Sequence, residues 1–436
     1  MEKITRDKIS AGLEVLKNLQ DSKLITHLNS CVHCGLCADS CLYYLTTKDE
    51  KMIPANKVDM VASIYRRYCT LTGKIAPGLV RARELNDETI SELTELLFGS
   101  CTMCGRCVKH CSIGVDIEYV IRKGREMLSR MGQVPESLQA TVDAALESGN
   151  NMAISDEDFL DTLEWMEEEL QDELNDPNAV IPLNQQGKNI LYTLNPREPK
   201  FFPLSISAMA KIFHAAKESW TLSTNMYDIT NYAYFTGNTE HSRIIAQRMY
   251  DEMHRLGAKK LVLAECGHGA RANRWEGPNY IEKTFPETIT SVELIAAYFK
   301  EGRLKADSNL TEGIVTLHDP CNLVRGGGIV HEQRYIIQQV TKNFVEMTPY
   351  GTDNFCCGGG GGQLAMEYDD RRIKIAEIKA EQIRKTGANI VVTPCHNCVD
   401  QLSQINITYK LNVQIKTMAE IVADSLIIEN NNEEKN

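Results

Sequence analysis

Two cysteine runs near the start of the chain have a spacing that can do redox chemistry. "CVHCGLCADSC" and "CTMCGRCVKHC" both follow the pattern C-x2-C-x2-C-x3-C. Three thiolates on a tight loop can hold three irons of a cubane [4Fe-4S] cluster, while the fourth, on the next helical turn, serves the neighbouring cluster. One cluster is therefore expected at Cys31, Cys34, Cys37 and Cys111. The other is expected at Cys101, Cys104, Cys107 and Cys41.

A pair of structural zinc sites is the alternative for these runs. Zinc takes four ligands and commonly uses pairs of Cys-X-X-Cys. Eight thiols in two runs of one pattern favour cubane clusters instead. The runs depart from the usual ferredoxin pattern at one point, since Leu42 and Ser112 stand where a proline normally follows the fourth cysteine.

A different cysteine pattern occurs in the C-terminal half, where "NFCCGGGGGQ" contains the adjacent pair Cys356 and Cys357. Cys321 and Cys395 each follow a short apolar run that is expected to form a strand, and Cys398 completes a Cys-X-X-Cys motif. In a parallel sheet, residues that follow strands meet at the carboxyl edge, where open α/β folds bind ligands. We therefore expect these five cysteines to converge on one iron cofactor.

The five glycines after the doubled cysteine, residues 358–362, explain how two consecutive thiols can reach one object. Glycine permits positive φ and a sharp bend, and its N–H groups are unobstructed donors to a negatively charged cluster. Gly358 and Gly359 are thus predicted to lie against the cofactor. A phosphate-binding loop is disfavoured because the Gly-Lys-Ser/Thr ending is missing.

The pattern of apolar residues predicts a multidomain α+β protein. Residues 1–130 are expected to form an all-α ferredoxin-like domain, and residues 131–187 an acidic helical linker. Residues 188–428 alternate short apolar runs with helical segments, which is typical of an α/β domain. Residues 429–436 are expected to be a disordered tail. The expected strands are 190–194, 261–264, 314–317 and 390–393.

The α/β region contains a faint internal repeat. "RLGAKKLVLAECGHG" at 255–269 matches "RKTGANIVVTPCHNC" at 384–398. Residues 188–305 are therefore expected to be a degenerate copy of the cluster-binding half, 306–428, that has kept only Cys266. This thiol is a candidate catalytic residue as a spare ligand or a partner of substrate sulfur, and an inert buried cysteine is the alternative.

One stretch of the linker accounts for most of the net negative charge of the chain. The formal net charge is −12, and residues 156–176 hold eleven acidic and no basic residues. Phe159, Leu160, Leu163, Met166, Leu170 and Leu174 are expected to form one face of an acidic helix that stops before Pro177. This helix is either a solvated linker or a docking surface for a basic partner. The charge argues against nucleic-acid binding, and no apolar run approaches the length of a membrane span.

The C-terminal pattern resembles the cysteine-rich CCG domain of heterodisulfide reductases, and the N-terminal runs resemble the small iron–sulfur subunit of the same enzymes. The fused layout is similar to the D subunit of heterodisulfide reductase. Because only one complete CCG motif is present, it looks more like the single-CCG K subunit of the Dsr complex and its counterparts in the Hmc and Tmc complexes. The resemblance implies two cubane clusters and one non-cubane [4Fe-4S] cluster bound by five cysteines.

The resemblance also implies a function. It points to a cytoplasmic protein, peripheral on the inner face of the membrane, that docks on a b-type cytochrome or quinone-linked membrane partner. Single electrons would pass through the cubanes to the non-cubane cluster, which reduces or forms a disulfide or trisulfide. In the Dsr case the substrate resembles a small sulfur-carrier protein, DsrC-like, with paired thiols.

Two other functions remain open. One is an electron-relay component of a flavin-dependent lactate, glycolate or glycerol-3-phosphate dehydrogenase, and the other is a redox sensor or assembly scaffold. Several side chains near the expected site also have more than one interpretation. His268, His318 and His396 are either proton donors to a leaving thiolate or hydrogen-bond partners of the ligands. Arg325 either attracts an anionic substrate or is an ordinary satisfied arginine, and Cys69 is expected in the core.

Overall fold

The computed structural model describes residues 5–18, 21–281 and 286–428, so the expected tail at 429–436 lies outside the described residues. The chain forms two compact units. Unit 1 comprises Met1–Val142, Tyr232–Ser242 and Phe355–Lys379, and unit 2 comprises Asp143–Asn231, Arg243–Asn354 and Ala380–Asn436. Two segments of the C-terminal half, Tyr232–Ser242 and Phe355–Lys379, thus pack in unit 1. The domain boundaries expected from the sequence stay predictions.

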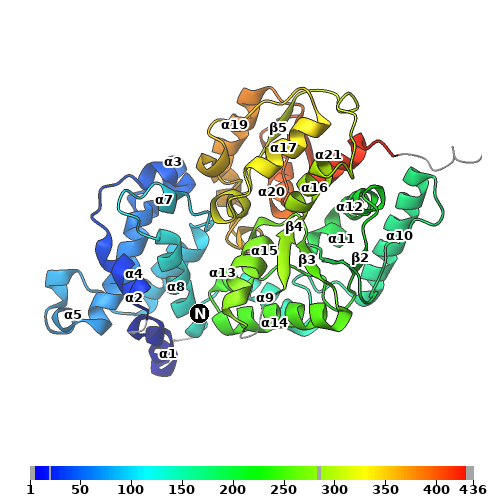
Figure 1. Ribbon diagram of the computed structural model, residues 1–436. Helices are drawn as coiled ribbons and strands as arrows, with labels where there is room; N and C mark the ends of the chain where they lie inside the picture. The colour runs from blue at the N-terminus through cyan, green and yellow to red at the C-terminus, as the bar shows by residue number, and fades with distance from the viewer. Residues whose placement is uncertain (1–4, 19–20, 282–285, 429–436) are drawn as a thin grey trace, which may run out of the picture. The chain divides into compact units, whose positions relative to one another are not determined.

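Unit 1 is helical and has the short turns expected around cysteine loops (Figure 1). Its helices are α1 (Arg6–Lys17), α2 (Ser22–Ser30), α3 (Leu42–Thr47), α4 (Pro54–Cys69), α5 (Leu71–Ile75), α6 (Asp87–Thr94), α7 (Arg106–Lys109), α8 (Ile117–Arg130), α13 (Ala233–Thr236) and α18 (Asp369–Ile375). Helix α8 begins where Asp116 accepts the N–H of Tyr119, and it packs against α1 and α4. Its buried apolar stripe explains this packing.

Unit 2 contains two parallel sheets. The first has the order β2-β1-β3-β4 and the second β5-β6-β7. The strands are β1 (Ile190–Tyr192), β2 (Trp220–Leu222), β3 (Lys260–Leu263), β4 (Glu287–Thr290), β5 (Val315–Leu317), β6 (Ile390–Val392) and β7 (Gln414–Lys416). Leu191 pairs with Thr221 and Leu261, and Val391 pairs with Thr316 and Ile415. The four strands expected from the sequence are thus confirmed to within one or two residues.

The helices of unit 2 surround these sheets, with the first half drawn in green and the second in yellow to red (Figure 1). They are α10 (Asp156–Leu174), α11 (Arg197–Phe201), α12 (Leu204–Ala215), α15 (Gly267–Ala270), α16 (Ser291–Lys300), α17 (His331–Val340), α20 (His396–Thr408) and α21 (Met418–Ser425). The remaining helices are α9 (Glu136–Ser148), α14 (Thr239–Leu256) and α19 (Glu377–Thr386). The α+β class with two pseudo-repeated α/β halves is confirmed.

The two halves of unit 2 are joined through Glu265, which follows β3. Its buried carboxylate accepts the backbone N–H groups of Met418 and Ala419 at the start of α21, at 2.9 and 2.7 Å. Its carbonyl oxygen accepts the N–H of His396 at 2.8 Å. A single residue thereby satisfies the N-termini of two helices from the other half.

The acidic helix α10 begins at the N-cap Ser155 and ends before Pro177, as expected. Phe159, Leu163, Met166, Leu170 and Leu174 are buried, and α10 packs against α12. The prediction for Leu160 is wrong, because this side chain is 43% exposed. Adjacent helical residues point about 100° apart, so Phe159 and Leu160 cannot share one face. No helix in the described part of the chain is long and apolar enough to cross a membrane.

Arg125 on α8 holds the segments of unit 1 together. Its side chain is fully buried and donates hydrogen bonds to the carbonyl oxygens of Leu97, Cys101, Phe235 and Gly361, at 2.8 to 2.9 Å. Burial lowers its pKa to about 10, which leaves the guanidinium charged at neutral pH. A planar fork of five donors suits carbonyls that approach from several directions.

We expect Arg125→Met to lower the free energy of unfolding by about 3–5 kcal/mol, because four buried carbonyls lose their donor. Arg125→Lys should recover only part of this loss, since an ammonium cannot reproduce the fork. Thermal unfolding of the cluster-loaded protein measures both effects. Arg130→Met is the matched control on the same helix, because the Arg130 side chain is 46% exposed. Equal melting temperatures for the Arg125 and Arg130 variants would contradict the prediction.

Candidate iron–sulfur and thiol site

The first cysteine run and the last cysteine of the second run lie together in unit 1. Burial, together with smaller contributions from the neighbouring thiols of Cys31 and Cys111, raises the pKa of Cys37 to about 11. The sulfur of the exposed Cys34 lies 3.8 Å from the Ser112 hydroxyl, directly after Cys111. The first cubane cluster is expected to take three ligands from the first run and its fourth ligand, Cys111, from the second. We call this exchange of fourth ligands the crossed assignment, and the observed neighbours agree with it.

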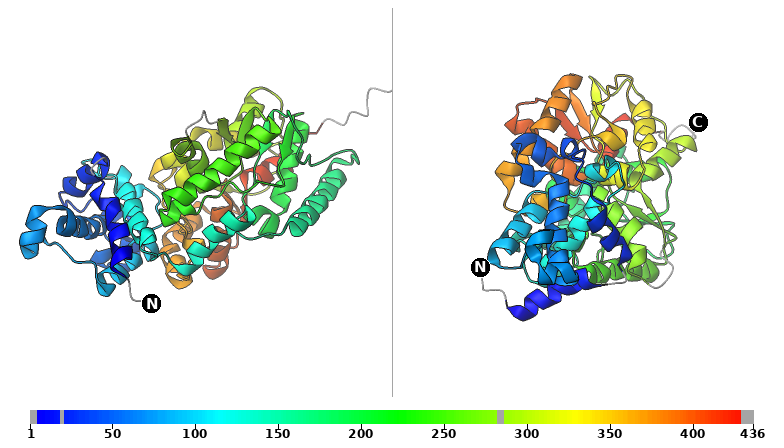
Figure 2. Two further views of the ribbon diagram at one scale, coloured as in Figure 1. Left: turned by 90° about the horizontal axis from the view of Figure 1, so that it is seen from below. Right: turned by 90° about the vertical axis from the view of Figure 1, so that its left-hand side faces the viewer.

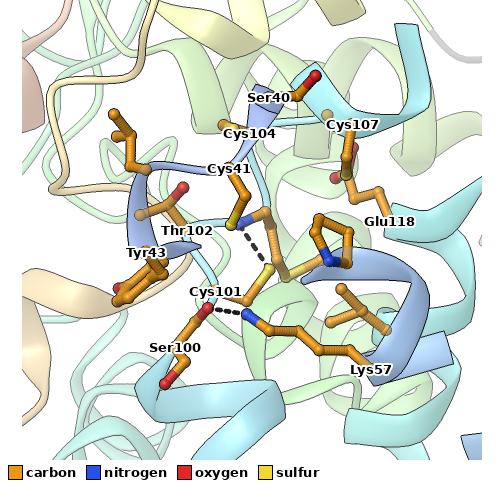
Figure 3. A pocket seen from close by; sticks show the side chains of 15 residues that line it. Ser40, Cys41, Tyr43, Lys57, Ser100, Cys101, Thr102, Cys104, Cys107 and Glu118 are labelled. Carbon is orange, nitrogen blue, oxygen red and sulfur yellow. Dashed lines mark hydrogen bonds between the residues drawn. The ribbon is translucent and has the colours of Figure 1, made fainter. Parts of the chain in front are cut away.

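The second set lines a single cavity. Cys41, Cys101, Cys104 and Cys107 face this cavity, so the fourth cysteine of the first run joins the first three of the second (Figure 3). Burial raises the pKa of the Cys107 thiol, and Cys104, Cys101 and Cys41 raise it further. A thiol loses its proton to the solvent when it binds iron, and four thiols around one cavity fit the ligands of a [4Fe-4S] cluster.

Buried cations lie beside this second set. Lys57, which is 1% exposed, donates a hydrogen bond to the carbonyl oxygen of Ser100 (Figure 3). Burial raises the pKa of Cys101, while the charges of Lys57 and Arg125 lower it. Glu118 also lines the cavity and offsets part of this positive charge. Sequence reasoning missed Lys57 and Arg125, since each occurs in an ordinary amphipathic helix.

The glycine run after Cys356 and Cys357 directs backbone donors to sulfur. The N–H of Gly358 donates to the Cys356 sulfur at 3.4 Å, and the N–H of Gly359 donates to the Cys357 sulfur at 3.5 Å. Gly358 has φ of 103°, which an L side chain rarely adopts. Hydrogen bonds of this kind stabilise thiolate ligands.

The same glycine run packs on the backbone of the second cysteine run. A Cβ atom on Gly360 would lie 2.9 Å from the Thr102 carbonyl oxygen, and one on Gly361 would lie 2.6 Å from the Thr102 carbonyl carbon. Gln363 donates to the carbonyl oxygen of Phe98 at 2.6 Å, which anchors the end of the loop. The glycines therefore also serve contact between protein segments, which the sequence did not indicate. Their contact with a cofactor stays a prediction.

Tyr43 lies near thiols of both the second cubane set and the doubled-cysteine loop. Its ring lines the cavity (Figure 3), and its pKa is raised by burial and then by Cys101, Cys41 and Cys356. The hydroxyl is buried and has no hydrogen-bond partner among the described residues. A sulfur atom of a bound cluster would satisfy this orphaned donor, so Tyr43 also fits the presence of a cofactor.

In unit 2 the remaining cysteines gather after the strands β3, β5 and β6. Cys266 and Cys398 both form hydrogen bonds with the Cys395 thiol, which lowers the pKa of Cys395. Gly267 N–H donates to the same sulfur at 3.5 Å. Cys321 is buried, and its neighbour Pro320 packs against Gly267. Cys266 therefore lies next to Cys395, one of the expected ligands in unit 2, as the internal repeat predicts. The role of Cys266 stays a proposal.

Two of the histidines near these cysteines, His268 and His396, are neutral hydrogen-bonding groups. Burial lowers the pKa of both His268 and His396 to about 4. His268 Nδ1 lies 3.3 Å from the Cys266 sulfur, and His396 Nε2 lies 3.0 Å from the Ser205 hydroxyl. His318 is fully buried as well. For His268 and His396, the pKa values favour hydrogen-bond partners over imidazolium proton donors.

Glu198, next to His396, is a buried acid whose pKa is shifted upward. Burial raises the pKa of its carboxyl group to about 8. One of its oxygens lies 3.6 Å from His396 Nδ1, and the other has no hydrogen-bond partner among the described residues. Glu198 is therefore a buried group that holds a proton at neutral pH.

The Arg325 side chain forms hydrogen bonds within unit 2. Its Nη1 donates to the carbonyl oxygens of Thr352 and Asn354, at 3.2 and 2.8 Å. The loop that precedes the doubled cysteine is thus fixed by this guanidinium, which favours the interpretation as a satisfied arginine. Cys69 is half-buried on α4, with its sulfur 3.7 Å from the Leu16 carbonyl oxygen.

Comparison with known families supports this arrangement. Residues 27–115 match the family model of the 4Fe-4S dicluster domain, and residues 315–403 match that of the cysteine-rich CCG domain. The dicluster domain holds two cubane [4Fe-4S] clusters, and the CCG domain in relatives of the heterodisulfide reductase D subunit binds a non-cubane cluster. The predicted cofactors are therefore confirmed, whereas their assignment to individual cysteines stays a proposal.

The chain is similar to curated proteins over most of its length. It is 29% identical to the Hdr-like menaquinol oxidoreductase iron-sulfur subunit 2 of Archaeoglobus fulgidus, across 96% of this chain and 83% of that protein. It is 24% identical to the D subunit of the dihydromethanophenazine:CoB–CoM heterodisulfide reductase of Methanosarcina barkeri, across 94% and 96%. It is also 23% identical to the EtfAB:quinone oxidoreductase of Syntrophomonas wolfei, across 89% and 57%.

The fold and the two kinds of cysteine set define an iron–sulfur oxidoreductase with an electron-transfer role. The chain combines a match to the 4Fe-4S dicluster domain with a match to the cysteine-rich CCG domain, and it is similar over nearly its whole length to the D subunit of heterodisulfide reductase.

The crossed ligand sets lead to opposite outcomes for two single substitutions. Cys41→Ser should impair the cluster expected at Cys101, Cys104 and Cys107, whereas Cys111→Ser should impair the cluster at the first run. Each variant is expected to lose about four iron atoms. Iron analysis and low-temperature EPR of the reduced protein measure the loss. Loss of the cluster signal of the run that contains the substituted cysteine, in either variant, would contradict the crossed assignment.

Removal of the Tyr43 hydroxyl should change a cluster potential without loss of iron. Tyr43→Phe deletes a buried hydrogen-bond donor, and such donors stabilise the more negatively charged, reduced state of a cluster. We expect the midpoint potential of one centre to become more negative in an EPR-monitored redox titration. Tyr44→Phe, one residue away, is the control and should leave all potentials unchanged. An unshifted titration for Tyr43→Phe would place the hydroxyl away from the clusters.

Proposed function

We propose that this protein uses electrons from its two cubane clusters to reduce a disulfide at the CCG centre. The supporting observation is the packing of the doubled-cysteine loop, through Gly360 and Gly361, on Cys101 and Thr102 of the second cysteine run. Backbone contact keeps the path between the two cofactor positions short. The reaction consumes one disulfide, two electrons and two protons, and it yields two thiols.

The ligands proposed for the CCG centre are the five cysteines of the C-terminal pattern: Cys321, Cys356, Cys357, Cys395 and Cys398. Gly358 and Gly359 donate to the sulfurs of the doubled cysteine. A bound non-cubane cluster would supply iron that captures each sulfur as the disulfide opens. Cys266, which contacts Cys395, is proposed to engage substrate sulfur there.

The electron donor is proposed to be a membrane partner, either a b-type cytochrome or another quinone-linked protein. The name of the Archaeoglobus relative, a menaquinol oxidoreductase component, supports a quinol as the source of electrons. This arrangement would place the chain in the cytoplasm, on the inner face of the membrane. The proposed substrate is a disulfide or trisulfide, with a DsrC-like sulfur carrier as one candidate.

A second candidate function is an electron relay that has no disulfide chemistry. It is favoured by the similarity to the EtfAB:quinone oxidoreductase, whose name couples a flavoprotein to a quinone. In that case the CCG centre would pass electrons on to a partner.

A reduced-viologen assay separates the two functions. We expect the cluster-loaded chain to oxidise benzyl viologen when the CoB–CoM heterodisulfide or oxidised glutathione is added. Cys357→Ser and Cys395→Ser should reduce this rate to background, because each removes a ligand of the CCG centre, while viologen still reduces both cubane clusters. Addition of a dithiol to the oxidised protein should produce an EPR signal that both variants lack.

Cys69→Ser is the control, since Cys69 lies on α4 outside all three expected ligand sets, and it should keep the rate and the signal. Normal cluster reduction without disulfide turnover or a dithiol-dependent signal would support the relay function instead.

A further inference from the structure

Three highly exposed aliphatic side chains lie on one short segment of unit 1. Leu71, Ile75 and Leu79 are 73%, 75% and 88% exposed. We call these three residues the apolar ridge. They lie on α5 and on the following turn, η3 (Pro77–Val80). Clustered exposed apolar residues, unlike isolated ones, indicate an interaction surface.

The apolar ridge is held in a fixed orientation. Leu71 and Ile75 are four residues apart, so they lie on one face of α5. The opposite face is packed against the end of α4, where a Cβ atom on Gly73 would lie 1.9 Å from the Arg66 carbonyl oxygen. Figures 1 and 2 both show α5, in light blue, on the outer side of the unit 1 helices, away from α8. The ridge therefore projects outward and is not a frayed end.

The surroundings of the ridge are positively charged, although the chain as a whole is acidic. Residues 66–83, "RRYCTLTGKIAPGLVRAR", contain five basic and no acidic residues. Three of the arginines form ion pairs, namely Arg66 with Asp59, Arg67 with Glu84 and Arg83 with Glu92.

The other two basic residues of the segment, Lys74 and Arg81, are exposed and have no ion-pair partner within the described residues. Lys74 and Lys17 both act on the pKa of Cys69, so the end of α1 adds a further positive charge on this side.

We propose that the apolar ridge inserts into the interface of an anionic lipid bilayer. Aliphatic side chains on a basic support are the combination that binds peripheral proteins to anionic lipid. A projecting ridge suits a bilayer surface, into which it can sink without a matching groove. A second copy of the chain is a poor partner, because twofold symmetry would bring Lys74 and Arg81 close to their own copies. The inference does not depend on the proposed disulfide chemistry.

Vesicle co-sedimentation of the cluster-loaded protein tests this proposal. Vesicles of phosphatidylcholine with phosphatidylglycerol should bind the protein, and pure phosphatidylcholine vesicles should bind it weakly. The double variant Ile75→Asp, Leu79→Asp should bind roughly tenfold more weakly or worse, because it removes the inserted groups. Lys74→Gln and Arg81→Gln should each cost about fivefold on the anionic vesicles only, as expected for one basic charge near such a surface.

Ile407→Asp is the matched control, because Ile407 on α20 of unit 2 is 79% exposed, and it should bind like the wild type. Iron content and circular dichroism confirm that each variant is folded. Background binding of the wild type to anionic vesicles, or equal losses in the ridge and control variants, would overturn the proposal. So would a ridge variant that binds vesicles normally but is released from native membranes, since that result identifies a protein partner.

Discussion

The buried guanidinium of Arg125 is the interaction on which unit 1 depends. It joins the carbonyl oxygens of Leu97, Cys101, Phe235 and Gly361, which belong to three segments far apart in the sequence. Burial of a charge without full hydrogen bonding is costly, so this arrangement is stable only when all the segments are in place. Assembly of the ferredoxin-type loop and docking of the doubled-cysteine loop are thus coupled to one side chain.

This coupling has a consequence for electron transfer. The glycine loop of the CCG motif packs within the same compact unit as the cubane cysteines, although the motif belongs to the C-terminal half of the sequence. Tyr43, Lys57 and Arg125 lie around that junction and place one hydroxyl and two charges beside the second cubane set. Charge, hydrogen bonding and burial are the means by which a protein sets cluster potentials, and all three act at this point.

Several elements could be predicted from the sequence because their causes are local. The strands at 190–194, 261–264, 314–317 and 390–393 are short apolar runs bounded by turn residues, and each forms within one or two residues of its expected position. The end of helix α10 before Pro177 was also predictable, because a proline does not continue a helix. Leu160 was misplaced because a one-residue step changes the helix face, which a list of apolar residues does not show. The sequence did not predict the buried roles of four polar residues, since nothing in their local sequence distinguishes them from surface residues. These residues are Tyr43, Lys57, Arg125 and Glu265.

The sequence by itself indicated the kinds of chemistry, because the close spacing of three cysteines within each run is covalent and suits one cubane cluster. The fourth ligand expected for each cluster comes from the other run, so its position depends on the fold. The sequence also determined that glycines must follow the doubled cysteine, because a side chain there would obstruct the backbone. Only the tertiary structure decided where that loop packs and which buried groups surround it. The physical reason is that burial and long-range hydrogen bonds arise when distant segments meet, and no local pattern of residues records such meetings.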